Sequence, residues 1–124
     1  MRAPEQLHAL RVVASPEVLD GLAWAGDVAA LRLAPDDLLA IGAASVEAGG
    51  EHLIVDEVGF VGWWLTADEV HAHVLPHLDW PLPTQRPALA QGLVAGVPAK
   101  LWLTEERALL LCAAAYAHEL EERL

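Results

Sequence analysis

The clearest pattern of apolar and polar positions runs from residue 58 to residue 70, where a strand leads directly into a helix. A strand that is apolar on both faces is usually covered on both faces, so we expect residues 58–65 to form a central strand. Two apolar sets alternate along this strand, one on each side: Val58, Phe60 and Trp64, and then Val61, Trp63 and Leu65.

The helix start that follows is equally clear. Thr66 is a good N-cap, and Glu69 three residues later completes a capping box, with Leu65 and Val70 positioned to close over it as a hydrophobic staple. Pro76 limits the length of this helix, because proline does not continue a helix comfortably.

The residues before this unit predict short strands and turns. Residues 1–15 fit either a short amphipathic helix or, from Leu10 to Ala14, an edge strand. Residues 38–43 are predicted to return as a hairpin strand after the Pro35-Asp36-Asp37 turn, although Pro followed by two acids also opens helices. The other strands predicted in this half cover Leu22 to Trp24, Val28 to Leu33 and His52 to Val55.

The residues after this unit predict a strand meander and a final helix. Prolines at 81, 83 and 87 force an extended connection, and Gly92 to Gly96 is predicted to be a strand. Residues 98–103 and 108–112 form a hairpin, and the helix at 113–124 is apolar along Tyr116, Leu120 and Leu124. Strands, a strand–helix unit, a meander and a helix predict a single α+β domain, with a mainly antiparallel sheet and helices on one face. We expect an N-terminal arm (1–21) followed by this domain (22–124).

Composition indicates a chain that needs a partner. Apolar residues make up 55% of the 124 residues, including five tryptophans, which is more than so small a domain hides easily. The formal net charge of −11 with only seven basic residues argues against nucleic-acid binding. The sequence has neither a signal-peptide pattern nor an apolar run of membrane-spanning length, so we expect a cytoplasmic protein without membrane contact. The single cysteine, Cys112, lies in an apolar run and is expected to be a buried, inert thiol.

Catalytic patterns are weak. His71, His73 and His77 lie near Glu69, but His71 and His73 face opposite sides of a helix, so no metal site is predicted. Neither of the two serines, Ser15 and Ser45, lies in a nucleophile elbow. Asp56 and Glu57 are adjacent on a strand and point to opposite faces, so they would not share a substrate. The sequence therefore predicts no catalytic residues, although a metal-dependent enzyme at His71, His73 and Glu69 stays as a weaker alternative.

Three passages resemble a known family. Residues 30–42 (ALRLAPDDLLAIG), Asp56 to Val70 with His73-Val74-Leu75, and Arg86 to Leu124 with its Val97-Pro98…Leu101-Trp102 sequence are similar to the small γ subunit of heterotetrameric sarcosine oxidases. That subunit is related to aminomethyltransferase-like domains such as the T-protein of glycine cleavage. The sequence departs from the family pattern at Glu57, where the family has serine, and at Thr66-Ala67, where Gly-Pro is common.

The resemblance implies a non-catalytic subunit of a flavin-dependent complex that oxidises N-methyl amino acids. It also implies that flavin, NAD and folate are handled by the larger subunits, and it identifies no cofactor-binding residue in this chain. We expect the chain to contact those subunits, or to self-associate, through the aromatic residues Trp24, Trp80 and Tyr116. The alternative is a free-standing, T-protein-like module that binds a folate-type ligand as a homodimer.

Overall fold

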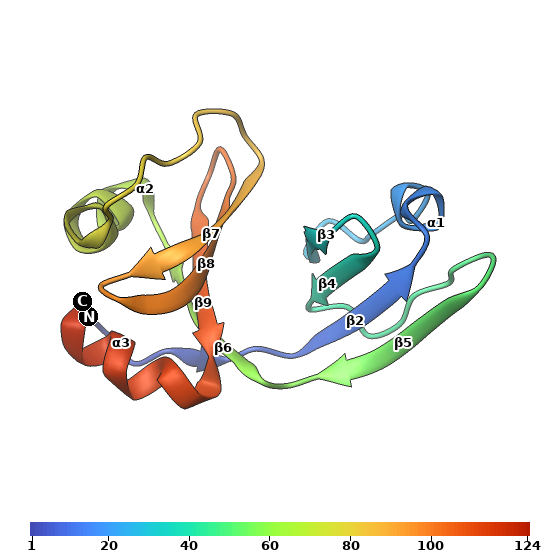
Figure 1. Ribbon diagram of the computed structural model, residues 1–124, viewed down its shortest axis with the longest axis horizontal. Helices are drawn as coiled ribbons and strands as arrows, with labels where there is room; N and C mark the ends of the chain where they lie inside the picture. The colour runs from blue at the N-terminus through green and yellow to red at the C-terminus, as the bar shows by residue number, and fades with distance from the viewer. The chain divides into compact units, whose positions relative to one another are not determined.

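A computed structural model describes residues 1–124 and confirms the α+β class: nine strands form two antiparallel sheets, accompanied by short helices. The chain divides into two compact units. The larger unit contains Met1–Gln6 and Gly59–Leu124, and the smaller unit contains Leu7–Val58. Figure 1 shows each unit with its own sheet.

The larger unit is built on a five-stranded sheet in the order β1-β6-β9-β8-β7. The predicted strand before the capping box is β6, which lies between β1 and β9. The predicted hairpin is formed by β8 and β9. The strand predicted at Gly92 to Gly96 lies earlier, as β7, and ends at Val94 because Ala95 and Gly96 form a turn. The strands are β1 (Glu5–Gln6), β6 (Phe60–Leu65), β7 (Ala88–Val94), β8 (Val97–Leu103) and β9 (Ala108–Ala113).

Helical segments of the larger unit share one core with one face of its sheet. Val70, Val74 and Leu120 from the helices pack in the same cluster as Trp63 and Leu110 from β6 and β9. The chain ends, Met1 and Leu124, border this cluster and lie side by side in Figure 1. The helical segments are α2 (Ala67–Glu69), the π-helix η1 (Val70–Val74), the 3-10 helix η2 (Leu75–His77), the 3-10 helix η3 (Ala114–Tyr116) and α3 (Ala117–Arg123).

The predicted capping box is present. The backbone N–H of Glu69 donates to the Thr66 hydroxyl at 3.2 Å, and the N–H of Thr66 donates to the Glu69 carboxylate at 3.1 Å. The expectation that β6 is covered on both faces is met only in part. Trp63 and Leu65 are buried, whereas Phe60 and Trp64 on the opposite face are only half-buried.

A tight turn joins β7 and β8, and the last helix holds it. Ala95 and Gly96 both have positive φ angles, 51° and 79°. Positive φ at both central residues is what a two-residue hairpin turn requires if its twist is to match the right-handed twist of the flanking strands. Arg123 at the end of α3 donates from Nη1 to the carbonyl oxygen of Ala95 at 2.8 Å. The helix and the sheet of the larger unit are therefore connected at the turn as well as through their core.

The smaller unit has a four-stranded sheet in the order β3-β4-β2-β5 and one helix, α1. Val12 lies directly between Leu38 and Ile54 in the register, and this row forms the centre of a small core. The side chains of Leu19, Trp24 and Val28 pack against the same core. The elements are β2 (Ala9–Ala14), α1 (Pro16–Asp20), β3 (Ala29–Ala34), β4 (Asp37–Ile41) and β5 (His52–Glu57).

Four sequence predictions about the smaller unit differ from the structure. Residues 22–24 form no strand, because their apolar side chains cover a sheet instead of joining one. Residues 16–20 form a helix that was not predicted, opened by the Ser15 hydroxyl, which accepts from the N–H of Val18 at 3.3 Å. The strand at 9–14 is interior and not an edge, since it pairs with both β4 and β5. The compact units divide at Leu7 and Val58, not after residue 21.

Candidate functional site

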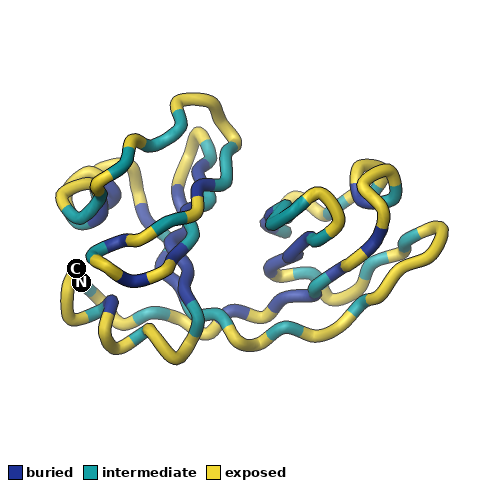
Figure 2. Tube along the Cα trace, viewed as in Figure 1, coloured by how far each residue is buried: buried dark blue, intermediate teal, exposed yellow.

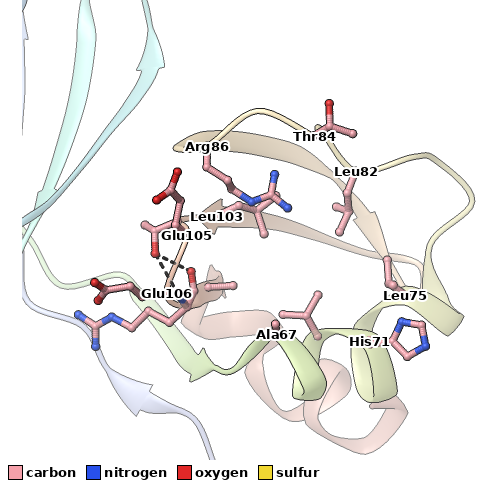
Figure 3. A pocket seen from close by; sticks show the side chains of 13 residues that line it. Ala67, His71, Leu75, Leu82, Thr84, Arg86, Leu103, Glu105 and Glu106 are labelled. Carbon is pink, nitrogen blue, oxygen red and sulfur yellow. Dashed lines mark hydrogen bonds between the residues drawn. The ribbon is translucent and has the colours of Figure 1, made fainter.

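The first candidate site is a cavity in the larger unit (Figure 3). It has a volume of about 490 Å³, is open to solvent on one side and is bordered by three segments: the helical turn after β6, the proline-rich connection and the β8–β9 hairpin. Its floor is apolar and buried, consisting of Val70, Leu103 and Ala108. Its rim is polar, consisting of His71, Thr84, Arg86, Thr104, Glu105, Glu106 and Arg107.

The cavity wall includes an unusual helical turn. Residues 70–74 are π-helical, and the N–H of Leu75 bonds to the carbonyl of Val70. This widened turn presents Val70, His71 and Leu75 to the cavity, whereas Val74 is buried in the core. Single π-helical turns within helices are frequent at functional sites, so this wall is a second feature that draws attention to the cavity.

The two arginines of the rim have different surroundings. The guanidinium of Arg107 stacks over the Trp64 ring at 3.8 Å, an arrangement that attracts the cation to the ring face. Arg86 instead belongs to the proline-rich connection and lines the cavity with its side chain, as Figure 3 shows. Its Nη1 donates to the carbonyl oxygens of Pro83 at 2.6 Å and Gln85 at 2.8 Å, and Arg86 takes part in no salt bridge.

The weaker metal-enzyme alternative placed a site at Glu69, His71 and His73. In the structure Glu69 accepts from Arg2 at 2.7 Å and from the backbone of Thr66, and its hydrogen bond with Arg2 lowers the pKa of its carboxyl group. His71 lies at the cavity rim and His73 is half-buried. The structure brings no three His, Cys, Asp or Glu side chains together as a possible metal site.

The other groups considered for chemistry have structural surroundings. Cys112 is buried, as predicted, and burial raises the pKa of its thiol. Ser15 caps α1. Asp56 is exposed, whereas Glu57 lies 3.6 Å from Arg11, which also forms a two-point ion pair with Asp37. The hydrogen bond to Asp37 raises the pKa of Arg11 above its usual value.

The second candidate site is an exposed apolar strip on the edge of the smaller unit. Val13 and Leu53 face each other across β2 and β5, and Val55 lies on the same face two residues along β5. All three side chains are exposed, Leu53 most of all at 59%. β5 is the last strand of its sheet, and Figure 2 shows it largely exposed along its length. A hollow of about 550 Å³ lined by Val13, Val18 and Leu53 adjoins this apolar strip.

Charge around this strip is strongly negative. Nine acidic residues against two arginines give the smaller unit a formal charge of −7, out of −11 for the whole chain. Both arginines are already paired: Arg11 with Asp37 and Glu57, and Arg32 with Asp20 at 2.6 Å. The strip is therefore an apolar surface in an acidic surrounding that has no unpaired basic side chain of its own.

The three predicted interface residues have different environments. Trp24 is half-buried against the core of the smaller unit. Trp80 is half-buried against the core of the larger unit, where its ring lies on Gly92 and its Nε1–H donates to the carbonyl of Leu93 at 2.9 Å. Tyr116 is 41% exposed. The interface at these residues stays a prediction, and the two tryptophans have packing roles within their own units.

Sequence reasoning did not identify Arg86 or the pair Leu53 and Val55 as candidates. Arg86 lies in a proline-rich connection that was interpreted only as extended chain. For β5, the available signal was the apolar pair two residues apart, flanked by Glu51, Asp56 and Glu57. Such a pattern predicts a strand but does not indicate whether that strand lies at an edge.

None of the helices has both the length and the apolar character needed to cross a membrane. Comparisons with protein-family models, curated proteins and solved structures found no match for this chain.

Proposed function

We propose that this chain is a small, non-catalytic docking subunit of a flavin-dependent complex that oxidises N-methyl amino acids. The observation that carries the proposal is the apolar strip of Val13, Leu53 and Val55 along an unpaired sheet edge. An edge strand offers a row of backbone donors and acceptors, and a partner strand satisfies them by extending the sheet. The type of complex is proposed from the resemblance of residues 30–42, of residues 56–70 with His73-Val74-Leu75, and of residues 86–124 to the γ subunit of sarcosine oxidases.

The partner follows from the chemistry of this surface. It would present an extended apolar segment to β5 and basic side chains to its surroundings, because the smaller unit carries a formal charge of −7. Complementary charge raises the rate of encounter and excludes acidic partners. Fully burying a leucine such as Leu53 contributes roughly 1.5–3 kcal/mol, enough for one side chain to alter binding measurably.

The test is reconstitution with the larger subunits of a sarcosine oxidase-type complex from the same cell. We expect the chain to co-elute with them in size-exclusion chromatography, and the double variant Leu53→Ser with Val55→Ser to bind about tenfold or more weakly. Leu93→Ser is the matched control, because Leu93 is 56% exposed, close to the 59% of Leu53, but lies on β7 of the larger unit. Co-elution that is absent, or that the control variant weakens as much as the double variant, contradicts the proposal.

A second candidate function is a T-protein-like module that binds a folate-type ligand as a homodimer. The cavity of about 490 Å³ with an apolar floor and a polar rim favours it, since ligand sites are concave and mostly apolar with a few polar groups. Tetrahydrofolate should then raise the melting temperature of the isolated chain. If the homodimer does not form through the apolar strip, the rise should be the same in the Leu53→Ser, Val55→Ser variant. An unchanged melting temperature at saturating tetrahydrofolate would exclude this function.

A further inference from the structure

We infer that the cavity of the larger unit binds a small molecule made of one carboxylate on a compact apolar body. Arg86 would receive the carboxylate, and the buried floor of Val70, Leu103 and Ala108 would hold the apolar part. This inference goes beyond the docking function, because it concerns another unit of the chain and another kind of partner.

Size and lining favour a small ligand of this kind. The volume of about 490 Å³ lies within the roughly 300–1,000 Å³ range that is usual for sites of small molecules. The floor is buried and apolar, and Leu75 and Leu82 add apolar side chains to the walls. Figure 3 shows Leu75 and Leu82 on the side of the cavity opposite Glu105 and Glu106, with the uncharged Thr84 and with His71 beside them, so the two acidic side chains lie away from these apolar walls.

Arg86 is held in a position suited to a carboxylate. Its two hydrogen bonds, at 2.6 Å and 2.8 Å, both use Nη1 and anchor the guanidinium to the carbonyls of Pro83 and Gln85. No carboxylate of the chain forms an ion pair with it. A guanidinium presents a planar fork of donors that matches the two oxygens of a carboxylate, and prior anchoring lowers the entropy lost on binding.

The charge of the rim favours a single negative charge on the ligand. Glu105 and Glu106 balance Arg86 and Arg107 in number, and the guanidinium of Arg107 is stacked on Trp64. A dianion such as a phosphate monoester would meet one available guanidinium and two carboxylates on the same rim. A monocarboxylate needs only the one cation that Arg86 supplies.

The experiment is a titration of the ¹⁵N-labelled full chain, followed by amide chemical shifts. The probes are 3-phenylpropanoate and its neutral counterpart 3-phenylpropanamide, which have the same apolar body and differ in the carboxylate. We expect 3-phenylpropanoate to shift the amides of residues 70–75, 82–86 and 103–108 in a saturable manner. The amide probe should bind about tenfold or more weakly, as the loss of a charge-assisted hydrogen-bond pair implies.

Three variants test the residues of the site and separate binding from folding. Arg86→Gln should weaken the carboxylate probe about tenfold or more and leave the amide probe unaffected. Because Arg86 also anchors its own connection, Ala67→Trp is the second variant: Ala67 is exposed at the cavity wall, and a large ring there fills the cavity without altering Arg86. It should abolish binding of both probes. Glu105→Gln removes a competing negative charge and should strengthen binding of the carboxylate.

Equal binding of both probes, unchanged binding in Arg86→Gln, or shifts confined to other residues would overturn the inference. Leu53→Ser with Val55→Ser should bind 3-phenylpropanoate as the native chain does. Loss of probe binding in that variant would also contradict the inference, because the ligand would then depend on the smaller unit. Failure of this titration leaves the docking function standing, since docking is measured by co-elution of subunits and not by ligand binding.

Discussion

The two units of this chain differ in what their cations contact, because only the larger unit adds aromatic rings to the carboxylate partners that both units have. In the larger unit, Lys100 lies 5.9 Å from the centre of the Phe60 ring and Arg107 lies over Trp64, so cations contact aromatic rings. In the smaller unit, the two arginines contact carboxylates, and most of its acidic residues have no basic neighbour. Both units are acidic, but the smaller unit carries a formal charge of −7 on 52 residues and the larger unit −4 on 72 residues, so the negative excess is concentrated in the smaller unit.

The units also differ in how they cover their apolar side chains. The larger unit covers one face of its sheet with helical segments before and after β7–β9, and its core cluster contains Trp63, Leu101 and Leu110. The smaller unit has a single five-residue helix and a small core around Val12. It leaves Leu53 and Val55 exposed on an edge strand. A short segment has too little chain to cover every apolar face, and the proposed docking surface lies on this smaller unit.

The largest expected effect tests whether the larger unit has the more closed core. Leu110→Ala removes a fully buried side chain from the centre of the larger core and should cost about 3 kcal/mol of unfolding free energy. Leu38→Ala in the smaller core should cost less, because fewer packed neighbours surround the gap and they can relax into it. Urea denaturation of both variants measures the difference. A larger loss in Leu38→Ala would reverse the comparison.

A second variant tests the packing of Trp80. An alanine Cβ at Gly92 would lie 2.9 Å from Cε2 of Trp80, closer than carbon atoms pack, so either the ring or the strand must move. We expect Gly92→Ala to cost about 1–3 kcal/mol and to shift tryptophan fluorescence to longer wavelength as the ring gains contact with water. Gly26→Ala is the matched control in the smaller unit, because nothing lies within 4 Å of its added Cβ. Unchanged fluorescence in Gly92→Ala would show that Trp80 does not depend on this contact.

A smaller effect depends on pH and concerns the capping box of the larger unit. The hydrogen bond from Arg2 lowers the pKa of Glu69 in the folded state. The ionised Glu69 therefore stabilises the fold fully at pH values above the pKa that Glu69 has in the unfolded chain. That contribution is lost as the pH falls through the lower, folded-state pKa. The difference in unfolding free energy between the native chain and Glu69→Gln should therefore be largest near neutral pH and shrink in acid. A difference that is constant with pH would show that the charge of Glu69 contributes nothing.

The smallest expected effect concerns the docking strip itself. Leu53→Ser should change the unfolding free energy by no more than about 0.5 kcal/mol, because the side chain is 59% exposed and supports no core. Thermal melting of the isolated chain measures this. A clear destabilisation would mean that Leu53 serves the fold of the smaller unit, and the strip would lose its value as evidence for docking.

Local chemistry was enough to predict much of the larger unit. The capping box at Thr66 and Glu69, the β8–β9 hairpin and the final helix depend on neighbouring residues, and all three are present. The helix at 16–20 could also have been predicted, since Ser15 followed by Pro16 and Glu17 is a typical helix start. These residues were instead placed within the N-terminal arm (1–21), with no element of their own.

The sequence by itself determined the α+β class, the strand and capping box around residues 60–69, the β8–β9 hairpin, the final helix and the burial of Cys112, because periodicity, caps and turns act over a few residues. Only the tertiary structure decided that the strands divide between two sheets, that β2 is interior and β5 an edge, and that Arg86 and Leu103 line one cavity. The physical reason is that strand order and cavity walls come from residues far apart in sequence. An apolar alternation such as that of Leu53 and Val55 is the same whether one neighbouring strand or two will pair with it.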